Sequence, residues 1–147
     1  MPVKGLADKR VVVTGGASGI GAATVERFRA EGANAVAIAD RDVDDPGLLC
    51  DVGDAESVAA AFARVDELLG GVDVLIANAG ISIRKPFLEI EEADWRRVLD
   101  VNLTGVFHCA QQAARRMVAG GGGVILMTAS TNGLTGHPFY ADYNASK

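Results

Sequence analysis

The sequence has few of the residues that mark a metal centre, a disulfide framework or a membrane span. Its two cysteines, Cys50 and Cys109, lie far apart and match no metal-binding or redox spacing, so we expect both to be small buried hydrophobic side chains. The apolar runs are as short as strands and cannot cross a bilayer. Residues 1–10 contain no apolar core of a secretory signal. These features predict a soluble cytoplasmic protein with no metal site and no membrane partner.

Basic residues are also scarce. The chain has 14 Lys and Arg against 19 Asp and Glu, a net charge of −5, and an isoelectric point of about 4.9. No cluster of Lys and Arg marks a nucleic-acid surface, so a nucleic-acid partner is disfavoured. Apolar residues, in contrast, make up 49% of the 147 residues. This content argues against disorder and predicts one compact domain over residues 1–147.

The apolar pattern predicts strands that alternate with helices. The strands are almost continuously apolar, which is typical of a parallel sheet buried on both faces. Helices must then cover both faces, so the predicted fold is a doubly wound α/β fold of the Rossmann type. The expected strands are Arg10–Thr14, Ala35–Ala39, Leu48–Cys50, Val72–Ala77 and Val124–Met127. The expected helices are Ile20–Glu31, a segment from an Asp54 N-cap to Leu69, and a long one from about Glu91 to Val118.

A glycine-rich turn joins the first strand to the first helix, with the spacing Gly15-x-x-x-Gly19-x-Gly21. Glycines let backbone N–H groups approach phosphate oxygens closely, and a helix N-terminus attracts anions. The order differs from G-x-G-x-x-G, and no Gly-Lys-Ser/Thr follows, which excludes a Walker loop. The turn predicts a dinucleotide pyrophosphate site, with an ordinary glycine-rich turn as the alternative.

Asp40 ends the second predicted strand, 19 positions after Gly21. A carboxylate there can accept hydrogen bonds from the adenosine ribose and would repel a 2′-phosphate. Arg41 follows and could stack on adenine or bind that phosphate, but the loop itself holds Ala17 and Ser18 rather than a basic residue. We therefore expect NAD rather than NADP. The alternative for Asp40 is a solvated loop acid.

Tyr143 and Lys147 lie one helical turn apart and so share one helix face. A cation beside a phenol favours the phenolate, which suits proton transfer to or from a substrate oxygen. Ser130 and Asn78 each follow a predicted strand, and Asn102 interrupts the long helix, where a polar residue has little local reason to be. Singly, they could be a turn hydroxyl, a turn former and a solvated helix residue.

Together these segments resemble the short-chain dehydrogenase/reductase family, in its compact single-domain branch. The resemblance rests on Thr14-Gly-x-x-x-Gly-Ile-Gly21, Asp51-Val52, Asn78-Ala-Gly80, Val101-Asn-x-x-Gly105, and Ser130 with Tyr143-x-x-x-Lys147. It covers the chain from about Leu6, with these motifs in the family's order and at its spacings.

The resemblance implies a role for each site residue. Tyr143 would be the general acid/base, Ser130 would hydrogen-bond the substrate oxygen, and Asn102 would anchor a water leading to Lys147. Lys147 would also hold the nicotinamide ribose and favour the phenolate form of Tyr143. The implied cofactor-binding residues are Gly15, Ser18, Gly19, Ile20, Gly21, Asp40, Arg41, Asp51, Val52, Asn78, Ala79, Gly80, Tyr143 and Lys147, with Asp51 and Val52 flanking adenine.

The resemblance also implies the function: an NAD(P)-dependent oxidoreductase that interconverts a secondary alcohol and a ketone of small-molecule size. One alternative is a dinucleotide-binding fragment without turnover. A more distant one is a sugar-nucleotide epimerase or dehydratase, whose loop usually has the different spacing Gly-x-x-Gly-x-x-Gly.

Family members continue well past the lysine with further strands and a substrate loop. We therefore interpret the chain as the N-terminal part of a longer enzyme, with the C-terminal strands missing. The edge of an apolar strand would then be exposed. In the family, the helix that here spans Trp95 to Met117 pairs across a subunit interface, so a homotetramer or homodimer is expected of the full-length form.

Overall fold

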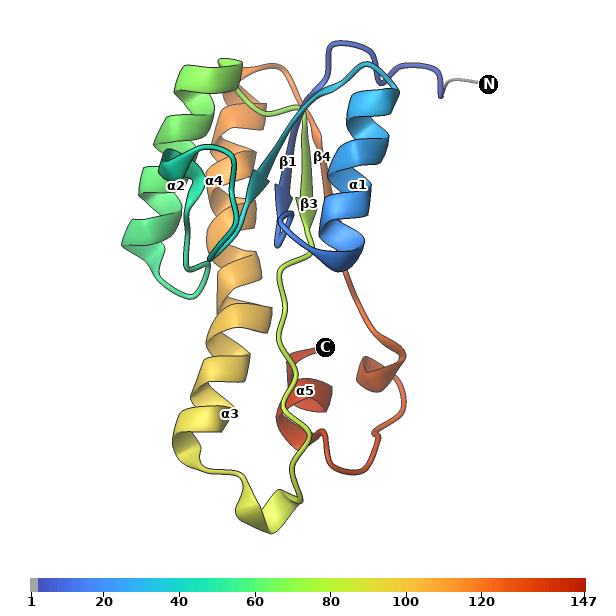
Figure 1. Ribbon diagram of the computed structural model, residues 1–147, viewed down its shortest axis with the longest axis vertical. Helices are drawn as coiled ribbons and strands as arrows, with labels where there is room; N and C mark the ends of the chain where they lie inside the picture. Colours follow the sequence, from blue (N-terminus) through green and yellow to red (C-terminus); the bar gives the residue numbers. More distant parts are fainter. Residues whose placement is uncertain (1–2) are drawn as a thin grey trace.

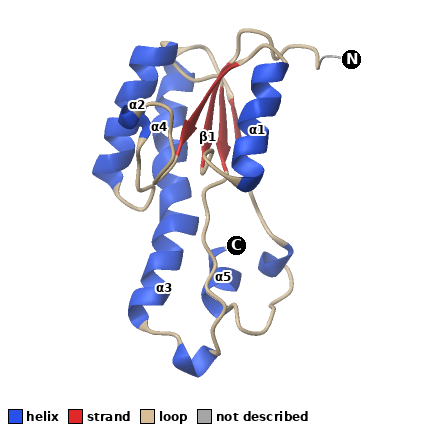
Figure 2. Cartoon of the chain, viewed as in Figure 1, coloured by secondary structure: helices blue, strands red, loops and turns tan. Residues whose placement is uncertain are grey.

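The computed structural model describes residues 3–147 as one parallel sheet with helices on both faces (Figures 1 and 2). The strand order is β2-β1-β3-β4. The strands are β1 (Arg10–Thr14), β2 (Asn34–Ile38), β3 (Val74–Ala77) and β4 (Val124–Met127). The helices are α1 (Gly19–Ala30), α2 (Ala55–Leu69), α3 (Glu92–Leu99), α4 (Gly105–Ala119) and α5 (Ala141–Ser146). The predicted doubly wound α/β fold is confirmed.

Successive residues of β1 face opposite layers of the core. Val11 and Val13 pack with Val25 in the layer under α1, whereas Val12 packs with Phe62 and other residues in the layer under α2 and α4. Figure 1 shows α1 on one face of the sheet and α2 with α4 on the other. The continuous apolar runs therefore reflect burial on both faces, as a parallel sheet requires.

The predicted strand at Leu48–Cys50 is wrong. A 3-10 turn spans Pro46–Leu48, and only a single bridge, between Ala39 and Leu49, continues toward the sheet. Leu48 and Cys50 are buried while Leu49 is exposed, so the apolar residues anchor a loop on the core. Pro46 has no N–H for a ladder, and the run behind it is too short to form one.

The helix boundaries follow the predicted caps. Asp54 caps α2 by accepting hydrogen bonds from the backbone N–H groups of Glu56 and Ser57 at 3.1 and 3.3 Å, and Gly70 ends it with a φ of +70°. The long predicted helix is confirmed from Glu92 to Ala119. It consists of α3 and α4, which are joined without a break by a π-helical turn at Asp100–Thr104. π-Turns are rare and are frequently found at functional sites. This one contains Asn102.

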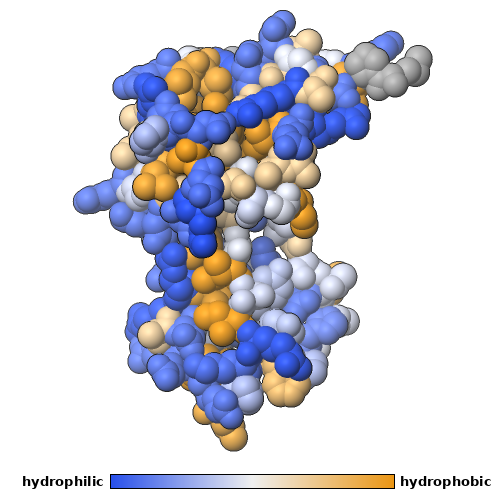
Figure 3. Space-filling view, in the orientation of Figure 1, coloured by the Kyte–Doolittle hydropathy of each residue, from blue (hydrophilic) through white to orange (hydrophobic). Residues whose placement is uncertain are grey.

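A smaller part of the chain extends past the carboxyl ends of the strands. It consists of α3, α5, the 3-10 turns Phe87–Glu89 and Thr131–Gly133, and the loops between them (Figure 1). The backbone N–H of Lys85 donates to the carbonyl of Phe139 at 2.9 Å and ties two of these loops together. The space-filling view shows a waist between this part and the sheet, with apolar residues on its surface (Figure 3).

Candidate active site

A cleft of about 690 Å³ opens at the carboxyl ends of β1, β2 and β3, where open parallel sheets place their ligands. Most of the predicted cofactor residues line it: Gly15, Ser18, Gly19, Ile20, Asp40, Arg41, Asp51, Val52, Asn78, Ala79 and Gly80. Gly21, Asn102, Ser130, Tyr143 and Lys147 do not line this cleft. Its wall also contains Ala17, Ala39, Asp42, Cys50, Ile81, Arg97 and Val101, none of which the sequence singled out as cofactor residues.

The glycine turn is packed too tightly for side chains. A Cβ on Gly21 would lie 2.1 Å from the carbonyl oxygen of Gly15, and one on Gly15, whose φ is +64°, would lie 2.9 Å from the Cα of Ala79. Gly19, with a φ of +53°, has open space instead. The Ser18 side chain makes no capping bond to α1. The first amides of α1 are thus available to an anion in the cleft, which fits a pyrophosphate.

Thr14 holds the two sides of the cleft together and was not predicted as a site residue. Its buried hydroxyl accepts hydrogen bonds from the backbone N–H groups of Asn78 and Ala79, both at 3.0 Å. The side-chain amide of Asn78 in turn donates to the Thr14 carbonyl at 3.2 Å. The sequence signal is a polar residue that ends an otherwise apolar strand.

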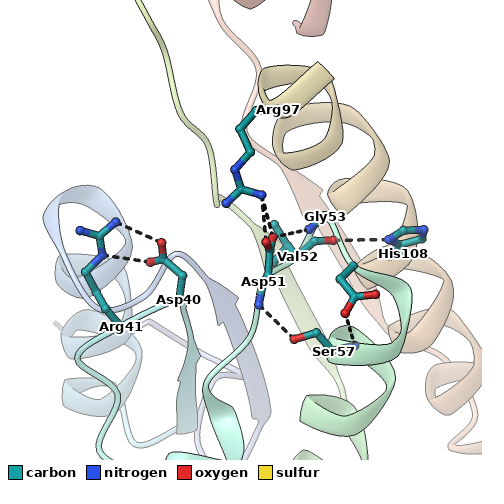
Figure 4. A network of polar contacts seen from close by, with 9 residues as sticks. Asp40, Arg41, Asp51, Val52, Gly53, Ser57, Arg97 and His108 are labelled. Carbon is teal, nitrogen blue, oxygen red and sulfur yellow. Dashed lines mark hydrogen bonds and ion pairs between the residues drawn. The ribbon is translucent and has the colours of Figure 1, made fainter. Parts of the chain in front are cut away.

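Asp40 and Arg41 form an ion pair at the mouth of the cleft (Figure 4). The Arg41 guanidinium donates to the two carboxylate oxygens at 3.1 and 3.0 Å. This guanidinium lowers the pKa of Asp40, so the carboxylate stays ionised at neutral pH. Both side chains are more than half exposed, which leaves them accessible to a ligand.

The turn formed by Asp51, Val52 and Gly53 makes the opposite wall (Figure 4). The Asp51 carboxylate accepts from the Gly53 backbone N–H at 2.9 Å and from Arg97 of α3 at 3.1 and 2.9 Å. Val52 is buried and packs so closely against Gly105 that a Cβ there would lie 2.8 Å from its side chain. Arg97 was not predicted; its only sequence signal is helical spacing from Val101, which also lines the cleft.

Asn102 is buried in the π-turn rather than solvated on a helix face. Its side-chain oxygen accepts from the Ile81 backbone N–H at 2.8 Å, and its amide donates to the Ile81 carbonyl at 2.8 Å and the Ser146 hydroxyl at 2.9 Å. The Ser146 hydroxyl donates onward to the Tyr143 carbonyl at 2.8 Å. Asn102 therefore connects the segment that follows strand β3 to helix α5.

The short helix α5 carries Tyr143, and Lys147 caps its C-terminus. The Lys147 ammonium lies 5.6 Å from the centroid of the Tyr143 ring and donates to the Thr128 carbonyl at 3.0 Å. Burial lowers the pKa of Lys147. A Cβ on Gly80 would lie 3.7 Å from this ammonium and 3.4 Å from the Asn102 side-chain oxygen. Gly80 therefore lies where the cleft meets the Tyr143–Lys147 pair.

Ser130 lies at the start of the loop that packs against α5. Its hydroxyl accepts from the Asn132 backbone N–H at 3.2 Å, and the Asn132 amide donates to Asn144 of α5 at 2.8 Å. Gly133 lies so close to Lys147 that a Cβ would come within 2.4 Å of its carbonyl carbon. The loop thus ties Ser130 to the helix that holds the tyrosine.

Both cysteines are buried, as predicted. Burial raises the pKa of Cys109 to about 12, so this thiol is not a nucleophile at neutral pH. Among residues 3–147, no group of three or more His, Cys, Asp or Glu side chains is arranged to hold a metal ion. The same residues contain no helix long and apolar enough to cross a membrane.

Known proteins share both the sequence and the fold. The chain is 38% identical over 143 residues to the 3-oxoacyl-[acyl-carrier-protein] reductase MabA of Mycobacterium tuberculosis, covering 95% of this chain and 58% of that protein. It is 42% identical over 155 residues to the cis-4-hydroxycyclohexanecarboxylate dehydrogenase of Sinomonas cyclohexanicum, covering 96% of this chain and 62% of that protein.

Solved structures agree with the sequence comparisons. An NAD+-bound xylitol dehydrogenase superposes with a TM-score of 0.89 at 31% identity, covering 98% of this chain and 61% of that one. A putative short-chain alcohol dehydrogenase from Sinorhizobium meliloti 1021 gives a TM-score of 0.89 at 32% identity, covering 96% and 62%. The chain thus spans about three fifths of the length of these relatives. The family model described as short chain dehydrogenase matches residues 9–147, and the chain therefore belongs to the short-chain dehydrogenase family.

Proposed function

We propose that this chain is the cofactor-binding and catalytic part of an NAD(P)-dependent oxidoreductase that interconverts a secondary alcohol and a ketone. The observation that carries the proposal is the Tyr143–Lys147 pair. Its lysine lies next to Gly80, which lines the cleft at the carboxyl ends of the strands. Family membership supports NAD(P)-linked oxidoreduction in general. In this proposal the cleft binds the cofactor, and the Tyr143–Lys147 pair transfers the proton.

The cleft residues hold the cofactor in this proposal. The amides at the start of α1 bind the pyrophosphate, because they have no side-chain acceptor and lie at the positive end of the helix dipole. Asp40 accepts from the adenosine ribose, and Asp51 with Val52 lines the adenine side. When bound, the nicotinamide supplies the hydride chemistry. Every other requirement, namely orientation, proton transfer and exclusion of water, falls to the protein.

Tyr143 gives a proton to the carbonyl oxygen during reduction and takes it back from the alcohol during oxidation. Lys147 supports this transfer because its ammonium lies over the tyrosine ring, 5.6 Å from the ring centroid, next to the phenol that exchanges the proton. Ser130 donates its hydroxyl hydrogen bond to the same substrate oxygen, after exchanging its present contact with Asn132. Asn102 and Lys147 flank Gly80, and a water between them would carry the proton outward.

We propose NAD as the preferred cofactor. The ionised Asp40 would repel a 2′-phosphate, and Arg41, the nearest cation, is already paired with it. The xylitol dehydrogenase with the same fold was solved with NAD+. We further propose a homodimer or homotetramer formed through the π-turn and α4, where the apolar side chains of Leu103 and Phe107 are 56% and 59% exposed.

The test is an oxidoreductase assay with a panel suggested by similar proteins, which also include a 3beta-hydroxysteroid dehydrogenase of Eggerthella lenta and an acetoacetyl-CoA reductase of Synechocystis. The panel contains acetoacetyl-CoA, a 3-ketosteroid, and cis-4-hydroxycyclohexanecarboxylate in the oxidative direction. NADH binding is measured beforehand by fluorescence. Turnover that falls by roughly 10²-fold or more in Tyr143→Phe, with a far smaller change in NADH affinity, supports the proposal. Saturable NADH binding with no turnover on any panel member supports the alternative of a dinucleotide-binding fragment.

A further inference from the structure

Arg97 is the one residue of α3 that reaches across to the adenine side of the cleft. Its guanidinium donates from a single nitrogen to the two oxygens of Asp51, at 3.1 and 2.9 Å. Figure 4 shows this side chain descending from its helix onto the Asp51 turn. The contact links the Asp51 carboxylate to a residue 46 positions away in sequence, on the helix that continues into Asn102.

The hydrogen bonds of the turn leave one acceptor open. Asp51 Oδ1 accepts from both the Gly53 backbone N–H and Arg97, whereas Oδ2 accepts from Arg97 alone. A carboxylate offers about four acceptor positions, so Oδ2 can take another donor. The backbone of the turn is held separately, by the Ser57 hydroxyl at the Asp51 N–H and by His108 at the Val52 carbonyl. Arg97 therefore orients the carboxylate rather than the chain.

We propose that Arg97 is a positioning residue for the adenosine half of the cofactor. It holds the Asp51 carboxylate so that Oδ2 accepts a hydrogen bond from the amino group of adenine. The inference rests on the proposed function, because it requires a dinucleotide in this cleft. It adds a determinant of affinity on α3, outside the glycine turn and outside the segment that contains Asp51.

The exposure of the pair separates this role from a structural one. Arg97 and Asp51 are 46% and 45% exposed, and ion pairs that exposed contribute little to folding stability. The neighbouring Arg96 supplies a matched control. It forms a still more exposed pair with Glu92 on its own helix, 71% and 75% exposed, and neither residue lines the cleft. A loss of affinity that occurs in the Arg97 variant but not in the Arg96 variant therefore reflects ligand binding and not a disturbance of the helix.

The experiment compares two halves of the cofactor as separate probes. Binding of ADP, which has the adenine, and of reduced nicotinamide mononucleotide, which lacks it, is measured by calorimetry for wild type, Arg97→Gln and Arg96→Gln. We expect Arg97→Gln to weaken ADP by about fivefold, the value of one lost hydrogen bond. Its affinity for the mononucleotide and its melting temperature should match those of the wild type. Arg96→Gln should leave the affinities for both probes unchanged.

A double-mutant cycle identifies the route of the effect. In the Asp51→Asn background, Arg97→Gln should have no further effect on ADP, because Arg97 acts through that carboxylate. Equal losses in both backgrounds would mean that Arg97 touches the ligand directly, and would overturn the proposal. Unchanged or tighter ADP binding in Arg97→Gln would do the same, as would equal weakening of both probes. If wild type binds NADH but Arg97→Gln behaves like wild type, only this inference fails; if wild type binds neither NADH nor NADPH, the proposed function fails with it.

Discussion

The ammonium of Lys147 lies 5.6 Å from the centre of the Tyr143 ring and is hydrogen-bonded to the Thr128 carbonyl beyond the end of β4. One turn of α5 thus brings a phenol and a cation together, and the sheet anchors the cation. Burial lowers the pKa of this lysine, because removal from water disfavours the charged form. The pair is consequently sensitive to pH in a direction that can be tested.

We predict that the affinity for NADH declines at alkaline pH and that Lys147 causes part of the decline. The lowered pKa means that Lys147 loses its charge at a lower pH than a solvated lysine does, and with the charge it would lose the proposed hydrogen bonds to the nicotinamide ribose. Fluorescence titrations from pH 7 to pH 10 should show a loss in wild type that is smaller in Lys147→Gln. Lys4→Gln, at an exposed position, should follow the wild-type curve. A Lys147→Gln curve parallel to wild type would remove Lys147 from the ribose site.

Asp40 should set the preference between the two dinucleotides. In Asp40→Ala the negative charge facing the 2′ position is gone and Arg41 is released from its pair. We expect the ratio of the NADPH and NADH dissociation constants to fall by about tenfold. The control is Asp44→Ala, which removes a charge from the same loop outside the cleft lining and should leave the ratio unchanged. An unchanged ratio in Asp40→Ala would place Asp40 outside the ribose site.

Gly21 should tolerate no side chain. A Cβ there would lie 2.1 Å from the Gly15 carbonyl oxygen, so Gly21→Ala must displace the turn that we propose to bind the pyrophosphate. We expect a destabilisation of about 1 to 3 kcal/mol in urea unfolding and a loss of NADH affinity of more than about tenfold. Gly121→Ala, at a φ of +91° with open space around it, should destabilise by about 1 kcal/mol and leave binding intact. Wild-type affinity in Gly21→Ala would contradict the assignment of the turn.

Much of this arrangement could be predicted from local patterns. The glycine spacing, the apolar strands and the Asp54 cap each depend on neighbours in sequence, and each is observed where expected. The prediction of a short third strand at Leu48–Cys50 was wrong because it, too, relied on local sequence alone. Three apolar residues after Pro46 have the composition of a strand, but only the tertiary structure decides whether they pair or pack.

The features that sequence did not predict depend on distant contacts. Asn102 was predicted as a site residue from its motif, but its burial depends on bonds to Ile81 and Ser146 that its sequence neighbours do not indicate. The π-turn around it has no recognised sequence signal. Arg97 differs from Arg96 only in the direction of its side chain, which the register of α3 decides.

The Arg10–Asp73 pair gives a prediction for stability. Hydrogen bonds from Arg10 lower the pKa of Asp73 to about 2, and the pair is 29% and 22% exposed. A depressed carboxyl pKa stabilises the fold above the unfolded pKa of about 4, and the stabilisation is lost as the pH falls toward 2. Asp73→Asn should therefore cost about 1 to 2 kcal/mol at pH 7 after allowance for solvent screening. The difference from wild type should narrow below pH 4.

Urea unfolding at pH 7 and pH 3 checks this prediction. Glu92→Gln, which removes a pair exposed by more than 70% on both sides, should cost less than about 0.5 kcal/mol at either pH. A constant difference between Asp73→Asn and wild type over this range would show that the carboxylate charge is not the source of the stabilisation.

We propose that the cleft at the carboxyl ends of the strands binds a dinucleotide. A second hollow, about 380 Å³ in volume and mainly apolar, lies outside α1 between Leu6, Ala23 and Phe28. The most direct test is a titration with NAD+ followed by amide chemical shifts in two-dimensional NMR. The largest shifts should occur at Gly19, Asp40, Val52 and Gly80, which line the cleft, with little change in the outer hollow. Shifts centred on Leu6, Ala23 and Phe28, or none at saturating NAD+, would contradict it.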